Sequence, residues 1–150
     1  IIRLSELYLN YAEALNEFSG PSSEVYDALN IIRDRAGIPS VQEAWTNIAY
    51  AVTPNKHTTK EGLREIIRQE RMIELAFEGH RYYDIRRWKL AEEYFSTPIK
   101  GWSVDEELEN NYYQIMDVSL RSFSSPRDYL QPISFDEISR NPNLIQNPGW

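Results

Sequence analysis

The sequence of 150 residues contains no cysteine. A disulfide framework and a thiolate metal site are therefore excluded. It has no run of roughly 18 apolar residues of the kind that spans a bilayer, and no signal peptide at its start. The six glycines are scattered and form no GxGxxG pattern, so no phosphate-binding loop of that type is present.

Positive charge and histidine are also scarce. Lysine and arginine number 16 against 23 acidic residues, which gives a net charge of −7. Such a balance excludes the basic footprint of a nucleic-acid-binding protein, whereas a neutral sugar would be indifferent to it. His57 has no second ligand-type residue at metal-binding spacing, which favours a solvated loop histidine. We predict neither a metal site nor a cofactor.

The composition is that of one globular unit. Hydrophobic residues make up 41% and charged residues 26%, ordinary values for a folded domain of this length. The chain already follows a helical pattern at Ile1.

Helical periodicity dominates the first forty residues. One helix ends near Ser19-Gly20-Pro21, since glycine and proline stop helices, and Ser22 or Ser23 caps the next. The apolar face of the second helix is Val25, Ala28, Leu29 and Ile32. The inner face predicted for the first is Leu4, Leu7, Tyr8, Tyr11, Ala12 and Leu15. This spacing is close to that of a tetratricopeptide helix, a unit that needs about three copies to be stable.

A second helical pair is predicted from about residue 60 to 78 and from Gly79 to about residue 95, with Thr58 or Thr59 as the first cap. The first member carries the apolar stripe Leu63, Ile66, Ile67, Ile73 and Phe77. Glu70 and Glu74 project from the middle of that stripe, and burying unpaired carboxylates costs several kcal/mol. The second member has the inner face Tyr83, Leu90, Ala91 and Tyr94, with Arg87 among them. We expect an ionic framework of Glu70, Glu74, Arg81, Arg86 and Arg87.

The alternative is an acid/base pair like that of a glycosidase. Carboxylates one helical turn apart point the same way, whereas a glycosidase needs its pair on both sides of the scissile bond. Glu78 and His80 do not have the Glu-x-x-His spacing of a helical di-metal site. The structural framework is therefore favoured, and we assign no catalytic residue.

The remainder changes to extended backbone. Met116, Val118 and Leu120 alternate with polar residues, which predicts a half-buried strand. A turn at residues 124–128 follows, then a short extended return over 129–133 and one helical turn from Ser134. Asn-Pro pairs then impose a non-helical tail. Apolar residues predict that this tail is pinned across the helices: Ile138, Leu144, Ile145 and Trp150.

Two runs make the chain similar to a known family. The first is ERMIELAFEGHRYYDIRRW at residues 70–88, and the second is the ending YLQPI, DEI, NPNL and QNPGW between residues 129 and 150. Both, in this order, resemble the C-terminal part of the SusD/RagB family of nutrient-binding outer-membrane lipoproteins. The resemblance covers almost the whole chain, but intervals 41–58 and 96–111 match little. The fold class expected is mainly α, with tetratricopeptide-like helical hairpins, a short β segment and an extended C-terminal tail.

The resemblance implies a non-catalytic receptor. Family members bind oligosaccharides or other nutrients at the cell surface and work with a SusC-like TonB-dependent transporter. Their membrane attachment is an N-terminal lipid anchor on a cysteine, which this sequence lacks. The resemblance therefore implies that residues 1–150 are the C-terminal piece of a longer precursor. A helical-repeat adaptor for proteins or peptides, and a glycoside hydrolase using Glu70, Glu74 or Glu78, stay as alternatives.

Ligand-binding candidates are aromatic residues outside the helical stripes, because sugar C–H faces stack on exposed rings. They are Trp45, Tyr50, Trp102, Tyr112 and Tyr113, with Asn47, Asn110 and Asn111 nearby as hydroxyl partners. The competing interpretation is that these rings pin loops to the helices, since burial is the usual use of aromatic side chains. The fragment can also hold only part of a binding site or none of it.

Overall fold

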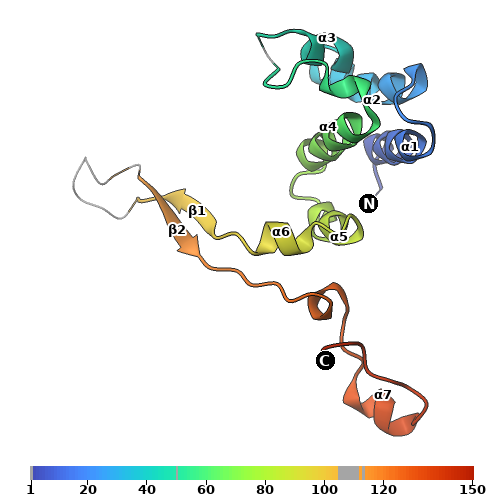
Figure 1. The fold of residues 1–150 in the computed structure, drawn as a ribbon, viewed down its shortest axis with the longest axis vertical. Helices are drawn as coiled ribbons and strands as arrows, with labels where there is room; N and C mark the ends of the chain where they lie inside the picture. Colours follow the sequence, from blue (N-terminus) through green and yellow to red (C-terminus); the bar gives the residue numbers. More distant parts are fainter. Residues whose placement is uncertain (1, 50, 105–111, 113) are drawn as a thin grey trace. The chain divides into compact units, whose positions relative to one another are not determined.

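The computed structural model describes residues 2–49, 51–104, 112 and 114–150. The fold is mainly helical with a small two-stranded sheet, which confirms the predicted class (Figure 1). Two compact units are present, unit 1 over Ile1–Arg81 and unit 2 over Tyr82–Trp150, where the composition had suggested one. Within the described ranges, no helix has both the length and the apolar character needed to cross a membrane.

Unit 1 is a small helical assembly. Its elements are α1 (Leu4–Ser19), α2 (Ser23–Ala36), α3 (Val41–Thr46), the 3-10 helix η1 (Lys56–Thr58) and α4 (Lys60–Glu74). Helix α1 packs against both α2 and α4, and η1 packs against α4. The first hairpin predicted from the sequence is therefore joined to α4 through α1.

Local signals set the ends of these helices as predicted. Gly20 follows α1 with a φ of 79°, a conformation that glycine adopts without strain. The Ser22 hydroxyl accepts a hydrogen bond from the Val25 N–H at the start of α2. The Thr59 hydroxyl does the same for the Gly62 N–H at the start of α4. Each cap satisfies a backbone donor that the helix itself leaves unpaired.

The core of unit 1 is apolar and tightly enclosed. Its buried members are Leu9, Ala12, Val25, Ala28, Leu29, Ile32, Val41, Leu63, Ile66, Ile67 and Leu75. The predicted face of α2 is buried in full. The predicted face of α1 is wrong in part, because Leu4, Leu7 and Tyr11 are exposed while Leu9 is completely buried. Helix α1 has to face α2 and α4 together, so its buried face runs between the two.

A close approach fixes η1 on α4. A Cβ atom added to Gly62 would lie 2.0 Å from the carbonyl oxygen of Lys56. Any side chain at this position would therefore displace η1 from the first turn of α4. The contact explains why a glycine stands inside a helix, where it normally lowers stability.

Helix α4 ends at Glu74, one turn earlier than predicted. The connection to α5 (His80–Arg87) contains Phe77 with a φ of 64° and Gly79 with a φ of 81°. Because the helix has stopped, Phe77 no longer follows the apolar stripe and is fully exposed; Ile73 is also mostly exposed. Leu75 is buried instead. The predicted stripe is therefore correct for its first three residues only.

The predicted helix from Gly79 to about residue 95 is divided. Helix α5 ends at Arg87, and α6 (Ala91–Phe95) begins after Lys89, whose φ is 59°. Of the predicted inner face, Ala91 is completely buried, whereas Tyr83 and Tyr94 are exposed. A left-handed residue between the helices changes their direction, so one continuous face cannot form.

A β-hairpin follows in unit 2. Strand β1 (Ile99–Trp102) pairs antiparallel with β2 (Ile115–Ser119), with Trp102 opposite Ile115. The predicted strand is confirmed, but its half-buried character is wrong, since all five residues of β2 are exposed. The sheet has only these two strands, and within the described chain the side chains of β2 face solvent.

The C-terminal segment folds back on itself. It contains the 3-10 helix η2 (Arg127–Tyr129) and α7 (Phe135–Arg140). The Gln146 side chain exchanges two hydrogen bonds with the Ile133 backbone, and the Trp150 indole N–H donates to the Arg127 carbonyl at 3.0 Å. The tail is thus tied to residues 127–133 of the same unit, and Ile145 is exposed.

Candidate functional site

The Glu70 carboxylate lies against α2. It forms an ion pair with Arg33, and only 16% of the Glu70 side chain and 9% of the Arg33 side chain are exposed. The Arg33 Nε donates a second hydrogen bond to the Pro39 carbonyl at 2.6 Å. The guanidinium therefore connects the segment between α2 and α3 to α4. Arginine suits this role because its planar fork of N–H donors can bind two acceptors in fixed directions.

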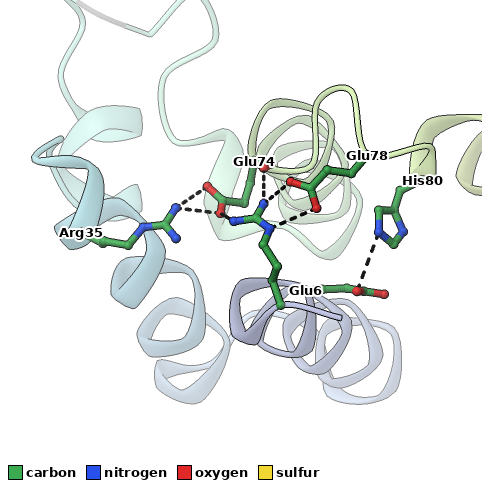
Figure 2. A network of polar contacts seen from close by, with 6 residues as sticks. Glu6, Arg35, Glu74, Glu78 and His80 are labelled. Carbon is green, nitrogen blue, oxygen red and sulfur yellow. Dashed lines mark hydrogen bonds and ion pairs between the residues drawn. The ribbon is translucent and has the colours of Figure 1, made fainter. Parts of the chain in front are cut away.

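Two arginines bind the Glu74 carboxylate at the C-terminal end of α4 (Figure 2). Arg3 approaches one carboxylate oxygen at 3.0 Å and donates to the Glu74 backbone carbonyl at 2.7 Å. Arg35 approaches the other oxygen at 2.6 Å. Burial raises the pKa of Glu74, but the hydrogen bond and charge of Arg35, together with the hydroxyl of Ser5 and the guanidinium of Arg3, outweigh it, and the pKa is lowered overall. The carboxylate is held in its charged form.

The same cluster continues to the start of α5. Arg3 also pairs with Glu78 at 2.6 Å, so one guanidinium joins the end of α4 to the connection that follows. The His80 Nε2 lies 3.7 Å from the Glu6 carboxylate of α1. Figure 2 marks this contact with a dashed line. We call the group Arg3, Arg35, Glu74 and Glu78 the junction cluster, with Glu6 and His80 as its flanking pair.

The predicted partners of Glu70 and Glu74 were wrong. Arg81, Arg86 and Arg87 were expected to neutralise them, but the partners are Arg33, Arg35 and Arg3. Arg86 instead lies 3.6 Å above the ring of Tyr82, and Arg87 pairs with Asp84 at 2.9 Å. Proximity in sequence favoured the following segment, whereas the fold brings the ends of the first hairpin onto α4.

His57 is buried, with 6% of its surface exposed, so the predicted solvated loop histidine is a further correction. The ring of Tyr26 meets it edge-on at 5.9 Å, and the Tyr26 hydroxyl donates to the His57 carbonyl at 3.0 Å. Burial lowers the pKa of His57, because the charged imidazolium is poorly solvated there. In the part of the chain that the structure describes, no group of three metal-ligating residues gathers.

The aromatic candidates fall into different environments. Trp45 is half-buried against the core of unit 1, with the Lys56 ammonium 5.6 Å from its ring centre. Trp102 on β1 in unit 2 is 55% exposed. Tyr112 is half-buried. Tyr50 and Tyr113, with Asn110 and Asn111, lie outside the described residues, and Asn47 follows α3 and is exposed.

Comparison with known proteins decides the family. The sequence model of the SusD family matches residues 1–150. The chain belongs to the SusD family. It is 39% identical, over 99% of its length, to SusD-like protein P2 of Formosa agariphila, and covers 25% of that protein. It thus spans about a quarter of this curated relative.

Solved structures agree with this SusD-family assignment. A SusD-like protein from Bacteroides fragilis matches 99% of the chain with a TM-score of 0.78 and 36% identity, over 25% of that protein. A second one from the same organism, described as a SusD-like carbohydrate binding protein, matches 97% with a TM-score of 0.71 and 36% identity, over 28% of its chain. The fold of this SusD-family chain is therefore shared with larger solved proteins.

Two features of this SusD-family chain were not predicted from the sequence. Arg33 follows directly on the apolar stripe of α2, one turn after Leu29, and this position could have marked it as the partner of a buried carboxylate. The other feature is a small pocket of about 90 Å³ between α1 and α2. It is lined by Leu4, Ser5, Tyr8, Ile31, Ile32 and Arg35. No local pattern indicates it, because it depends on the packing of two helices.

Proposed function

We propose that this chain is the C-terminal part of a longer cell-surface protein that binds oligosaccharides or another nutrient. The observation that carries the proposal is the SusD-family match over residues 1–150. Its length, about a quarter of the relatives, supports a larger parent protein. The similar Bacteroides fragilis protein described as carbohydrate binding supports the ligand class. A glycan is uncharged in most forms and is compatible with the net charge of −7.

The proposal includes a partner and a location. The parent protein would be held at the outer membrane by a lipid on an N-terminal cysteine outside this sequence. It would deliver its ligand to a SusC-like TonB-dependent transporter. Both statements follow from the family and concern the whole protein, of which this chain would be one part.

The function is proposed to be binding without catalysis. Glu70 and Glu74 are each held by arginines, and the lowered pKa of Glu74 is opposite to the raised pKa that a general acid needs. They also come from successive turns of one helix, so they would meet a substrate from one side. These contacts support a framework role for the carboxylates and weigh against the hydrolase alternative.

Among the aromatic candidates that the structure describes, Trp102 is the best suited to a sugar. Trp102 is 55% exposed on a strand, whereas Trp45 is half-buried against the core with the Lys56 ammonium 5.6 Å from its ring centre. A sugar face needs an accessible ring, and stacking on such a ring contributes roughly 0.5–1.5 kcal/mol. We therefore propose that Trp102 contributes to ligand binding and that Trp45 supports its loop.

The test uses the full-length gene product and isothermal titration calorimetry with a panel of oligosaccharides. Trp102→Ala should weaken the binding of the best ligand by roughly two- to tenfold, the range that stacking on one ring supplies. Trp150→Ala is a matched control, because Trp150 is 50% exposed and lies outside the candidate set. Trp45→Ala should lower the unfolding midpoint and leave affinity unchanged.

Purification from detergent-solubilised outer membranes tests the partner. A TonB-dependent transporter should co-purify with the tagged protein. Absence of both oligosaccharide binding and a transporter would contradict the proposed function. Binding that is equally strong in Trp102→Ala and wild type would contradict the Trp102 assignment alone.

A further inference from the structure

The β-hairpin of unit 2 places aromatic, apolar and charged side chains on one face. Strands β1 and β2 run side by side, with Trp102 directly opposite Ile115 and Lys100 directly opposite Asp117 (Figure 1). Residues directly opposite each other in an antiparallel pair project to the same face, and so do residues two apart on one strand. These four residues therefore share one face, which we call the hairpin face.

Gly101 gives independent support for this arrangement. It lies opposite Met116, so both belong to the other face of the hairpin. A Cβ atom added to Gly101 would come within 2.8 Å of the Val118 side chain, so Val118 fills the space above the glycine. Met116 and Val118 thus lie on the Gly101 side, and the hairpin face is the opposite one.

The hairpin face is accessible to a ligand. Trp102 and Ile115 are both more than half exposed, and Lys100 and Asp117 are exposed as well. In the described part of the chain, neither Lys100 nor Asp117 takes part in an ion pair or a side-chain hydrogen bond. An ammonium donor and a carboxylate acceptor are therefore available beside an aromatic ring.

The paired strands hold the Trp102 backbone in place. The Ser103 N–H donates to the Gln114 carbonyl at 2.9 Å, just beyond Trp102, and Ser103 is buried. Lys100 and Asp117 are paired before it, so Trp102 lies between two paired positions of the hairpin. A ligand that stacks on Trp102 meets a backbone that is already ordered, and binding therefore costs less conformational entropy.

We propose that the hairpin face is a subsite for one neutral sugar unit of an oligosaccharide. The C–H face of the sugar stacks on Trp102, the Lys100 ammonium donates to one hydroxyl, and the Asp117 carboxylate accepts from a neighbouring hydroxyl. Residues two apart on a strand are separated by roughly 7 Å, so both charged groups reach the edge of a sugar that lies on the ring. The subsite rests on the proposed function and adds the residues that read the sugar hydroxyls.

The charges of the hairpin face favour a neutral sugar. Lys100 and Asp117 carry opposite charges, so the face has no net charge of its own. An acidic sugar that approached Lys100 would also meet the Asp117 carboxylate, on a chain whose net charge is −7. Specificity depends on such a repulsive group as well as on the attractive ones. Asp117 therefore discriminates against carboxylated sugars.

Isothermal titration calorimetry on the full-length gene product tests the subsite with four oligosaccharides. Three are neutral hexasaccharides, of glucose, mannose and xylose, and the fourth is the hexasaccharide of galacturonic acid. Wild type should bind at least one neutral probe, and it should bind the acidic probe more weakly. Lys100→Ala and Asp117→Ala should each weaken binding of the tightest neutral probe by roughly two- to tenfold, the range that one hydrogen bond contributes.

Two further variants separate recognition from structure. Met116→Ala is the matched control, because Met116 is half-exposed on the opposite face of the same hairpin, and it should bind like wild type. Asp117→Asn keeps an acceptor oxygen and loses the charge, so it should retain neutral binding within about twofold and bind the acidic probe more tightly. A purely structural Asp117 would not change the ratio of the two affinities. Circular dichroism should give the same unfolding midpoint for all of these variants.

Neutral binding that is unchanged in Lys100→Ala or in Asp117→Ala would overturn the subsite and leave the proposed function unaffected. An equal loss in Met116→Ala, or a wild type that prefers the acidic probe, would overturn it too. A wild type that binds none of the neutral probes would also overturn the subsite, and co-purification of the transporter then decides the proposed function separately.

Discussion

Units 1 and 2 are built by different means. Unit 1 encloses a continuous apolar core in which Leu9, Leu63 and Ile67 are completely buried. Among the described residues of unit 2, the buried hydrophobic side chains are Ile85 and Ala91. Unit 2 relies instead on cations above rings, such as Arg86 over Tyr82, and on side-chain hydrogen bonds in its tail.

This difference shows where the stability of the chain resides. Apolar burial contributes roughly 25 cal/mol per Å² and is not weakened by salt, whereas exposed polar and cation–ring contacts contribute about 1 kcal/mol or less each. An isolated two-stranded hairpin like β1–β2 is also marginal in water. We expect unit 1 to dominate unfolding of the isolated chain and unit 2 to tolerate substitution.

The largest effect is expected at Glu70. Glu70→Ala strands the largely buried guanidinium of Arg33, and removing one partner of a buried ion pair costs about 3–5 kcal/mol. Thermal unfolding followed by circular dichroism should show a midpoint lower by roughly 10 °C or more. Glu74→Ala should also lower the free energy of unfolding, although its partner Arg35 is more exposed than Arg33.

The control for this prediction is Glu137→Ala in unit 2. Glu137 pairs with Arg140 at 3.5 Å, and both side chains are mostly exposed. Such a pair contributes at most about 1 kcal/mol. Equal midpoints for Glu70→Ala and Glu137→Ala would show that burial of the first pair has no energetic consequence.

The next largest loss of stability is expected at Leu63, and Leu120 provides the comparison. Leu63→Ala removes a completely buried side chain from the core of unit 1 and should cost about 2–5 kcal/mol. Leu120→Ala in unit 2 removes a side chain that is 82% exposed and should change the free energy of unfolding by less than about 0.5 kcal/mol. Urea denaturation measures both. A large loss in Leu120→Ala would mean that the segment after β2 is packed in solution.

The smallest effect concerns helix caps. Thr59→Ala removes the hydroxyl that accepts from the Gly62 N–H and should cost about 1 kcal/mol. Ser134 holds the same position before α7, but its side chain makes no capping hydrogen bond. Ser134→Ala should therefore be close to neutral. Urea midpoints for the two variants test the contrast, and an equal loss in both would contradict it.

The sequence predicted best what neighbouring residues decide. The glycine stop after α1 and the hydroxyl caps of α2 and α4 were correct, since each is a contact within a few residues. The buried face of α2 was correct in full. Burial on α1 was not, because periodicity gives the spacing of an apolar face but not which neighbours the helix will meet.

The candidate site shows the same division between what the sequence predicts and what the fold decides. That Glu70 and Glu74 need cationic partners follows from their place in an apolar stripe, because a buried carboxylate is costly unless paired. Which arginines serve was decided by the fold, since Arg3 and Arg33 are distant in sequence from α4. The burial of His57 was likewise decided by packing, through the contact of η1 with α4 and the ring of Tyr26.

The sequence by itself determined the helical class, the caps, the family and the need to neutralise two carboxylates, because these depend on local hydrogen bonding, periodicity and the cost of burying charge. Tertiary structure alone decided the early end of α4, the arginines of the junction cluster and the contact of His80 with Glu6. These depend on how close distant segments come, and packing fixes that distance only when the whole unit has formed.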